Sequence, residues 1–166
     1  MWYNGVMELK LNREYALRHL FVTALMLGLS AWFGYDAYVR YPSTPARELY
    51  VAIERAEPPE GTDLEPFKAQ KVRSQKGFAL LAFAASALVG MGLWKAARFR
   101  FGFDDDGFTV GARRYGYDEI KSLDDRAWAK KGVTKVVLAD RTIVLDAWHH
   151  TGVKEFHDLA VSSGIF

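Results

Sequence analysis

An uncharged apolar run in the middle of the chain constrains the fold more than any other feature. Residues 77–94 (GFALLAFAASALVGMGLW) contain no charged side chain, and their only polar side chain is Ser86. A helix of this length spans about 27 Å, close to the thickness of a bilayer's hydrocarbon core. A core helix of a small soluble domain usually carries a polar stripe, and this run has none. The run therefore predicts a transmembrane helix over residues 77–97, closed by interfacial Trp94 and by cations.

A second segment, residues 17–40, has the same character. Its central part, residues 20–35 (LFVTALMLGLSAWFGY), is uncharged, and charged and aromatic residues mark both ends. A cleaved signal peptide is the alternative. The apolar stretch is too long for one, and it ends in Trp32 and Phe33 where a cleavage site requires small residues. We therefore expect an uncleaved transmembrane helix here as well.

The two spans divide the chain into five segments. We expect an interfacial N-terminal segment (1–16), a first span (17–40), a helical connection (41–76), a second span (77–97) and a C-terminal domain (98–166). In the connection, Thr44 is the expected cap of a short helix that Pro58 and Pro59 end, and a second helix runs from about Asp63 into the second span. Lys and Arg near the membrane number six on each side, so the positive-inside rule does not orient the chain.

Small residues predict how the two spans meet. Ala82, Ser86 and Gly90 recur every four residues and therefore lie on one face of the second helix. Ala24 and Gly28 form a shorter stripe of the same kind on the first helix. Small side chains let helix backbones approach closely in a membrane, so these five positions are the predicted contact, within one chain or between copies.

After residue 98 the apolar period changes from that of a helix to that of a strand. Phe99, Phe101 and Phe103 alternate with Arg100 and Gly102, and an Asp-Gly turn follows, which predicts a β-hairpin. Further strands are expected at residues 113–120, 126–130, 133–138 and 141–148, and a helix is expected from a Thr151 cap to Gly164. The fold class is thus a membrane α-helical hairpin plus a small α+β domain, a curled antiparallel sheet of about six strands capped by a C-terminal helix.

The stretches FDDDGFTV (103–110), RRYGYDEIKSL (113–123) and VKEFHDLAV (153–161) resemble bacterial membrane-anchored pleckstrin-homology-like (PH-like) domains. The resemblance covers residues 98–166, and the two preceding spans match a common arrangement of that family. It implies binding or scaffolding at the bacterial inner membrane, with both termini and the C-terminal domain in the cytoplasm. The domain is under 70 residues long, short for seven strands, so one strand is missing or supplied from elsewhere in the chain.

Cations suggest an alternative role as an anionic-lipid surface module. The turn at residues 104–107 is acidic and would repel the phosphates that eukaryotic relatives of this fold bind on their first hairpin. Near a surface each cation contributes about 1 kcal/mol toward anionic lipid. The candidate lipid-surface contacts are Lys95, Arg98, Arg100, Arg113, Arg114, Arg126, Lys130 and Lys131. A solvated strand face is the simpler reading of most of them.

Histidines are the best remaining candidates for chemistry. His149, His150 and His157, with Asp146, are metal-ligand types near one strand-to-helix turn, but adjacent histidines on an extended chain point opposite ways. We therefore expect no metal.

Carboxylates offer no clearer site. Asp124 and Asp125 fall in a turn with no companion base, and the twelfth position of a calcium loop starting at Asp104 is Tyr115, not glutamate. These polar clusters are expected in turns and on solvated faces.

No residue pattern in the sequence indicates a particular enzymatic reaction. The chain has no cysteine, no phosphate loop, no dinucleotide motif and no serine–histidine–aspartate spacing, so we expect neither enzyme activity nor a cofactor. A net charge of +2 without a basic block does not indicate nucleic acid. The predicted function is a non-enzymatic membrane-anchored scaffold or accessory subunit, in contact with membrane lipid and with a protein partner or a second copy. The alternatives are the lipid module above and a membrane enzyme or transporter component with an unrecognised site.

Overall fold

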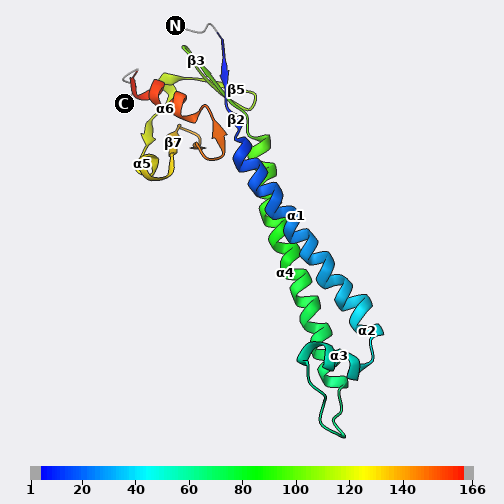
Figure 1. The fold of residues 1–166 in the computed structure, drawn as a ribbon. Coiled ribbons are helices and arrows are strands. Elements are labelled where there is room, and N and C mark those ends of the chain that lie inside the picture. The colour runs from blue at the N-terminus through cyan, green and yellow to red at the C-terminus, as the bar shows by residue number, and fades with distance from the viewer. Residues whose placement is uncertain (1–4, 163–166) are drawn as a thin grey trace. The chain divides into compact units, whose positions relative to one another are not determined.

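The structure is a computed structural model that describes residues 5–162 of the 166-residue chain (Figure 1). Its described residues fall into two compact units. One unit is built from residues 5–18 and 92–162, and the other from residues 19–91. The first contains all the β-strands, and the second is helical.

Two long helices dominate the chain. The first, α1 (Arg13–Tyr35), continues through a π-helical segment η1 (Asp36–Arg40) into a short α2 (Tyr41–Ser43). The second, α4 (Glu65–Arg98), follows the short α3 (Ala46–Glu54) and runs without a break into the predicted second span. Residues 13–43 and 65–98 are each long and apolar enough to cross a membrane, and the most apolar window of each is only 0% and 11% buried.

The connection between the two long helices contains α3, and the ends of this helix differ from those that the sequence predicts. Thr44 does not cap α3, because its hydroxyl donates to the carbonyl of Arg40 (2.7 Å) at the end of the preceding helical segment. The helix ends at Glu54, before the predicted stop at Pro58, because Arg55 adopts a left-handed conformation (φ 55°). The start of α4 agrees with the prediction, and Asp63 accepts a hydrogen bond from the Glu65 backbone N–H (3.0 Å).

Within the helical unit, α1 and α4 contact each other through hydroxyl groups and rings. The Ser86 hydroxyl donates to the Thr23 carbonyl (3.2 Å), and the Ser30 hydroxyl donates to the Ala79 carbonyl (2.9 Å). Ser86 and its predicted neighbour Ala82 are buried. Serine hydroxyls that reach a neighbouring backbone allow the close approach expected of small residues.

Within one chain, the face of α1 that makes this contact carries Thr23 and Ser30, and the packing of Ala24 and Gly28 between copies stays a prediction. Ala24 and Gly28 are exposed, and a Cβ built on Gly28 would meet no atom within 4 Å. A Cβ on Gly90 of α4, in contrast, would lie 3.7 Å from the Thr23 side chain. One position along a helix turns the side chain by about 100°, so a contact at Thr23 leaves Ala24 pointing elsewhere.

The strands of the other unit form three small antiparallel sheets. The largest has the order β1-β3-β4-β5, and its hairpin pairs Asp104 with Gly107, as the Asp-Gly turn predicts. The bounds are β1 (Met7–Glu8), β2 (Lys10–Leu11), β3 (Phe101–Asp104), β4 (Gly107–Val110), β5 (Arg113–Gly116), β6 (Ser122–Asp124), β7 (Val133–Val137), β8 (Thr142–Asp146) and β9 (His150–Thr151). The second sheet has the order β6-β7-β8, and β2 pairs with β9.

A single apolar core holds this unit together. The C-terminal helix α6 (Val153–Ser162) places Phe156 against Phe101, Phe103 and Phe108, with ring centroids 4.9, 5.4 and 6.0 Å away. Strand alternation adds Val136 of β7 and Ile143 and Leu145 of β8, because alternate residues of these strands point inward. The buried apolar residues are Leu9, Phe101, Phe103, Phe108, Tyr115, Ile120, Val136, Leu138, Ile143, Leu145, Val153 and Phe156.

Residues 7–11, far from the C-terminal segment in the sequence, pack with this core. Strands β1 and β2 pair with β3 and β9, and between them the buried Leu9 donates its N–H to the Phe101 carbonyl (2.9 Å). The C-terminal domain therefore does not begin at residue 98 alone, since residues 7–11 supply two of its strands. Whether these strands stand in for one missing from a PH-like sheet stays a prediction.

Three further expectations for the domain are wrong. Residues 128–131 form a helical turn, α5 (Trp128–Lys131), where a strand was predicted at 126–130. Tyr117 lies in a 3₁₀ turn, η2 (Tyr117–Glu119), beyond the end of β5. Thr151 is part of β9 and donates its hydroxyl to the Lys10 carbonyl (3.3 Å), so it does not cap α6. The predicted helix end at Gly164 lies outside the described residues.

The helix contact yields a matched prediction. Replacing Gly90 by leucine places a branched side chain against Thr23, and we expect the unfolding free energy to fall by about 1–3 kcal/mol through overpacking. Gly28→Leu adds the same atoms at an open position and should leave stability unchanged or slightly raised. Thermal unfolding of the full chain in detergent, followed by the helical circular dichroism signal, measures both. Equal shifts in the two variants would contradict the observed contact.

Candidate functional site

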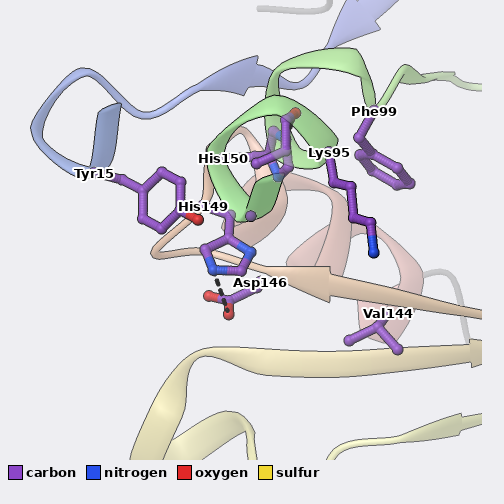
Figure 2. A pocket seen from close by; sticks show the side chains of 9 residues that line it. Tyr15, Lys95, Phe99, Val144, Asp146, His149 and His150 are labelled. Atoms are coloured by element: carbon purple, nitrogen blue, oxygen red, sulfur yellow. Dashed lines mark hydrogen bonds and ion pairs between the residues drawn. The ribbon is translucent and has the colours of Figure 1, made fainter. Parts of the chain in front are cut away.

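A pocket of about 380 Å³ lies in the β-containing unit, beside the last turns of α4 (Figure 2). Most of its wall is apolar, with ionisable side chains at a few points. Its lining residues are Tyr15, Gly92, Lys95, Ala96, Phe99, Val144, Asp146, His149 and His150. We call it the Lys95 pocket. Only Lys95 of this set belongs to the predicted lipid-contact residues. The pocket as a whole has no local signature because its residues come from three separate segments, 15, 92–99 and 144–150.

His150 fixes the end of α4 at this pocket. Its ring is buried, and Nε2 lies 2.9 Å from the carbonyl oxygen of Ala96. Because a carbonyl can only accept, Nε2 carries the hydrogen and donates it. The last carbonyls of a helix lack partners within it, so His150 satisfies one of them. The Phe99 ring packs 5.2 Å from the His150 ring and closes this side of the pocket.

His149 and Asp146 form the other polar edge. Nε2 of His149 lies 3.7 Å from an oxygen of Asp146, and the Tyr15 ring packs 4.4 Å from the His149 ring (Figure 2). The other oxygen of Asp146 accepts the backbone N–H of Trp148 (2.8 Å), which holds the carboxylate in place. Lys95 makes no ion pair with any residue between 5 and 162. The pocket therefore presents an ammonium and an anchored carboxylate.

The two adjacent histidines do not separate as predicted. Both rings line the Lys95 pocket, with centroids 6.3 Å apart, although their partners differ. Within residues 5–162 no three His, Asp or Glu side chains are grouped to hold a metal ion. The expectation of no metal stays a prediction.

A second polar cluster joins α6 to β7, with Thr134 and His157 buried and Asp125 partly exposed. The fully buried Thr134 of β7 donates its hydroxyl to one oxygen of Asp125, and Nε2 of His157 lies 3.1 Å from the other oxygen. The Trp128 ring stacks on the His157 ring at 4.0 Å. Asp125 thus has the companion base that the sequence did not reveal, and His150 and His157 do not lie on a solvated face. Asp125 and His157 are 32 residues apart in the chain, so no local sequence pattern predicts their contact.

Several of the predicted lipid-contact arginines are paired with carboxylates. Arg114 binds Asp104 through two hydrogen bonds (2.7 and 2.8 Å), and these hold the pKa of Asp104 below its usual range. Arg126 makes the same kind of bond to Asp124 (2.7 and 2.8 Å) and lowers the pKa of that carboxyl well below its usual range. The acidic hairpin turn is thus partly neutralised by the chain itself.

The other cations of that set are distributed over the domain. Arg113 pairs with Asp140 (2.9 Å), and the Arg98 guanidinium lies 4.3 Å from the Trp94 ring centroid. Arg100, Lys130 and Lys131 are exposed. Burial raises the pKa of the Tyr117 hydroxyl to about 12, and this hydroxyl donates to the Asp104 carbonyl (2.7 Å), which is a structural role.

Comparison with protein-family models gives no match, and comparisons with curated proteins and with solved structures give none either. The PH-like resemblance therefore stays a prediction.

The cluster under α6 yields a stability prediction. Asp125→Ala leaves the Thr134 hydroxyl and the His157 ring buried without their partner, and we expect a loss of about 1–3 kcal/mol in the unfolding free energy of the domain. Asp158→Ala removes the other carboxylate beside His157, which is 61% exposed and 3.5 Å away, and should change stability by less than about 0.5 kcal/mol. Denaturant unfolding followed by tryptophan fluorescence compares them. A similar cost in both would mean that Asp125 has no special role.

Proposed function

We propose that the chain is a two-pass membrane protein whose PH-like domain binds a protein partner, as a non-enzymatic scaffold or accessory subunit. The observation that carries the membrane part is the exposure of the two long helices. Large apolar side chains such as Phe21, Leu80 and Leu88 are exposed along them, and their most apolar windows are almost unburied. A soluble core helix would bury that surface, so lipid is the medium that suits it.

The mixed sheet unit supports a PH-like domain in its general plan. It combines small antiparallel sheets with a C-terminal helix whose Val153, Phe156 and Ala160 are buried in the core. Residues 7–11 supply two further short strands, which supports the idea that a strand of this sheet comes from another part of the chain.

The hydrogen bonds that engage several ionisable groups of the domain within the fold favour a binding role. Asp104, Asp124 and Asp125 are each committed to an arginine, a hydroxyl or a histidine within the fold, and His150 is committed to a helix end. Groups that hold a fold together in this way are poorly placed to exchange protons with a substrate. A partner would instead bind exposed surface, and Val161 at the end of α6 is an exposed apolar residue there.

The anionic-lipid alternative has less support. Arg113, Arg114 and Arg126 lie beside carboxylates that offset their charge, which weakens any long-range attraction to an anionic surface. We propose a bacterial inner-membrane location, with the domain and both termini in the cytoplasm, on the family resemblance alone.

Cysteine labelling tests the two-pass topology, because the chain has no cysteine of its own. Glu60→Cys in the connection and Ala112→Cys in the β4–β5 turn are both exposed. In intact cells with a permeable outer membrane, an impermeant maleimide should label position 60 and should reach position 112 only after lysis. The protein should also stay in the pellet after a carbonate wash. Recovery in the wash supernatant would refute the membrane spans, and the reverse labelling would refute the orientation.

Co-purification tests the scaffold role. Full-length protein extracted in mild detergent should carry a stoichiometric protein partner, and Val161→Asp should release it because a charge would enter an apolar contact. Ser162→Asp adds the same charge at the neighbouring exposed residue and should retain the partner. Quantitative mass spectrometry of the purified complexes measures both. A wild-type chain that purifies alone, or equal retention in both variants, would count against the proposal.

A further inference from the structure

We propose that the Lys95 pocket binds the head group of a phospholipid that carries both a phosphate and a primary ammonium, as phosphatidylethanolamine does. The inference rests on the proposed membrane location of the chain and adds a ligand to it. It differs from the anionic-lipid surface considered above, because it uses one pocket with both signs of charge.

The position of the pocket in the chain favours a lipid. Gly92 and Lys95 lie directly at the end of the uncharged run of α4, and Trp94 between them is 54% exposed. Tryptophan and lysine at this point of a span are typical of the depth at which lipid head groups lie.

The charges of the pocket select the kind of head group. Lys95 offers an ammonium to a phosphate, and Asp146 offers a carboxylate to an ammonium (Figure 2). Asp146 is held by the Trp148 N–H and lies beside His149, so it remains in the pocket as a fixed acceptor. A phosphatidylglycerol head group would gain the first contact but would offer only neutral hydroxyls to the Asp146 carboxylate. A zwitterionic head group satisfies both, and each contact is a charge-assisted hydrogen bond.

The remaining wall suits the apolar part of the same molecule. Phe99, Val144 and Ala96 line the pocket next to the charged groups. Its volume of about 380 Å³ falls within the range of about 300–1,000 Å³ common for small-ligand sites. Glycerol carbons and the first acyl carbons would cover this surface, which a free head group could not do.

The test uses the full-length protein in detergent and three probes. These are short-chain phosphatidylethanolamine, short-chain phosphatidylglycerol and glycerophosphoethanolamine, which lacks acyl chains, each titrated and followed by calorimetry. We expect phosphatidylethanolamine to bind best, and Lys95→Met and Asp146→Asn each to weaken it by about tenfold, the loss expected of one charge-assisted hydrogen bond. Lys95→Arg should keep most of the affinity.

Lys130→Met is the matched control, because it removes an exposed lysine of the same domain and should leave binding unchanged. Asparagine at position 146 can still accept the Trp148 N–H, and circular dichroism verifies that this variant folds. Wild-type affinity in both pocket variants would overturn the proposal, as would tighter binding of phosphatidylglycerol. Equal binding of glycerophosphoethanolamine would overturn the assignment to a membrane lipid. Failure of the membrane proposal is read separately, from the carbonate wash.

Discussion

The pairing of residues 7–11 with the C-terminal domain is the interaction on which the rest of the described structure depends. Residues 7–11 add β1 to the largest sheet and pair β2 with β9, and Leu9 between them enters the core. Gly152 shows how close this contact is, since a Cβ there would lie 2.9 Å from the Leu9 side chain, and its φ of +91° also favours glycine. Only Asn12 separates β2 from α1, so the pairing fixes where the first long helix starts.

Buried polar groups give the domain its specificity. His150 bonds a carbonyl at the end of α4, and the Thr134–Asp125–His157 set joins β7 to α6. Such groups are costly to bury alone and must be satisfied together, so they favour one arrangement of the core over others of equal hydrophobicity. The same residues that would serve as general bases elsewhere are engaged here in holding the fold. This is the physical basis for preferring a binding role to a catalytic one.

The Lys95 pocket unites the two halves of the proposed function. Its polar edge comes from the sheet unit, through Asp146 and His149, and its Lys95 edge comes from the last turns of a helix that is apolar enough to span a bilayer.

The sequence by itself determined the elements whose signals are local. The uncharged run of residues 77–94, the Asp-Gly hairpin at 104–107, the alternation in β7 and β8 and the apolar stripe of α6 all follow from neighbouring side chains, and each is present in the structure. Periodicity over ten or more residues carries such information because one face must be buried. The small-residue stripe of α4 agrees with the contact between α1 and α4 within one chain, since Ala82 and Ser86 are buried. Ala24 of α1 is exposed in the single chain.

Only the tertiary structure decided the rest. Strands β1 and β2 have two residues each, too short for a period, and their partners lie more than 90 residues away in the chain. The helical turn at 128–131 places Trp128 on His157, a contact that outweighs a strand-like alternation of five residues. The His157–Asp125 pair and the Lys95 pocket likewise join residues from separate segments. Side-chain chemistry fixes what each residue can bind, but its partner is chosen when distant segments pack together around one core.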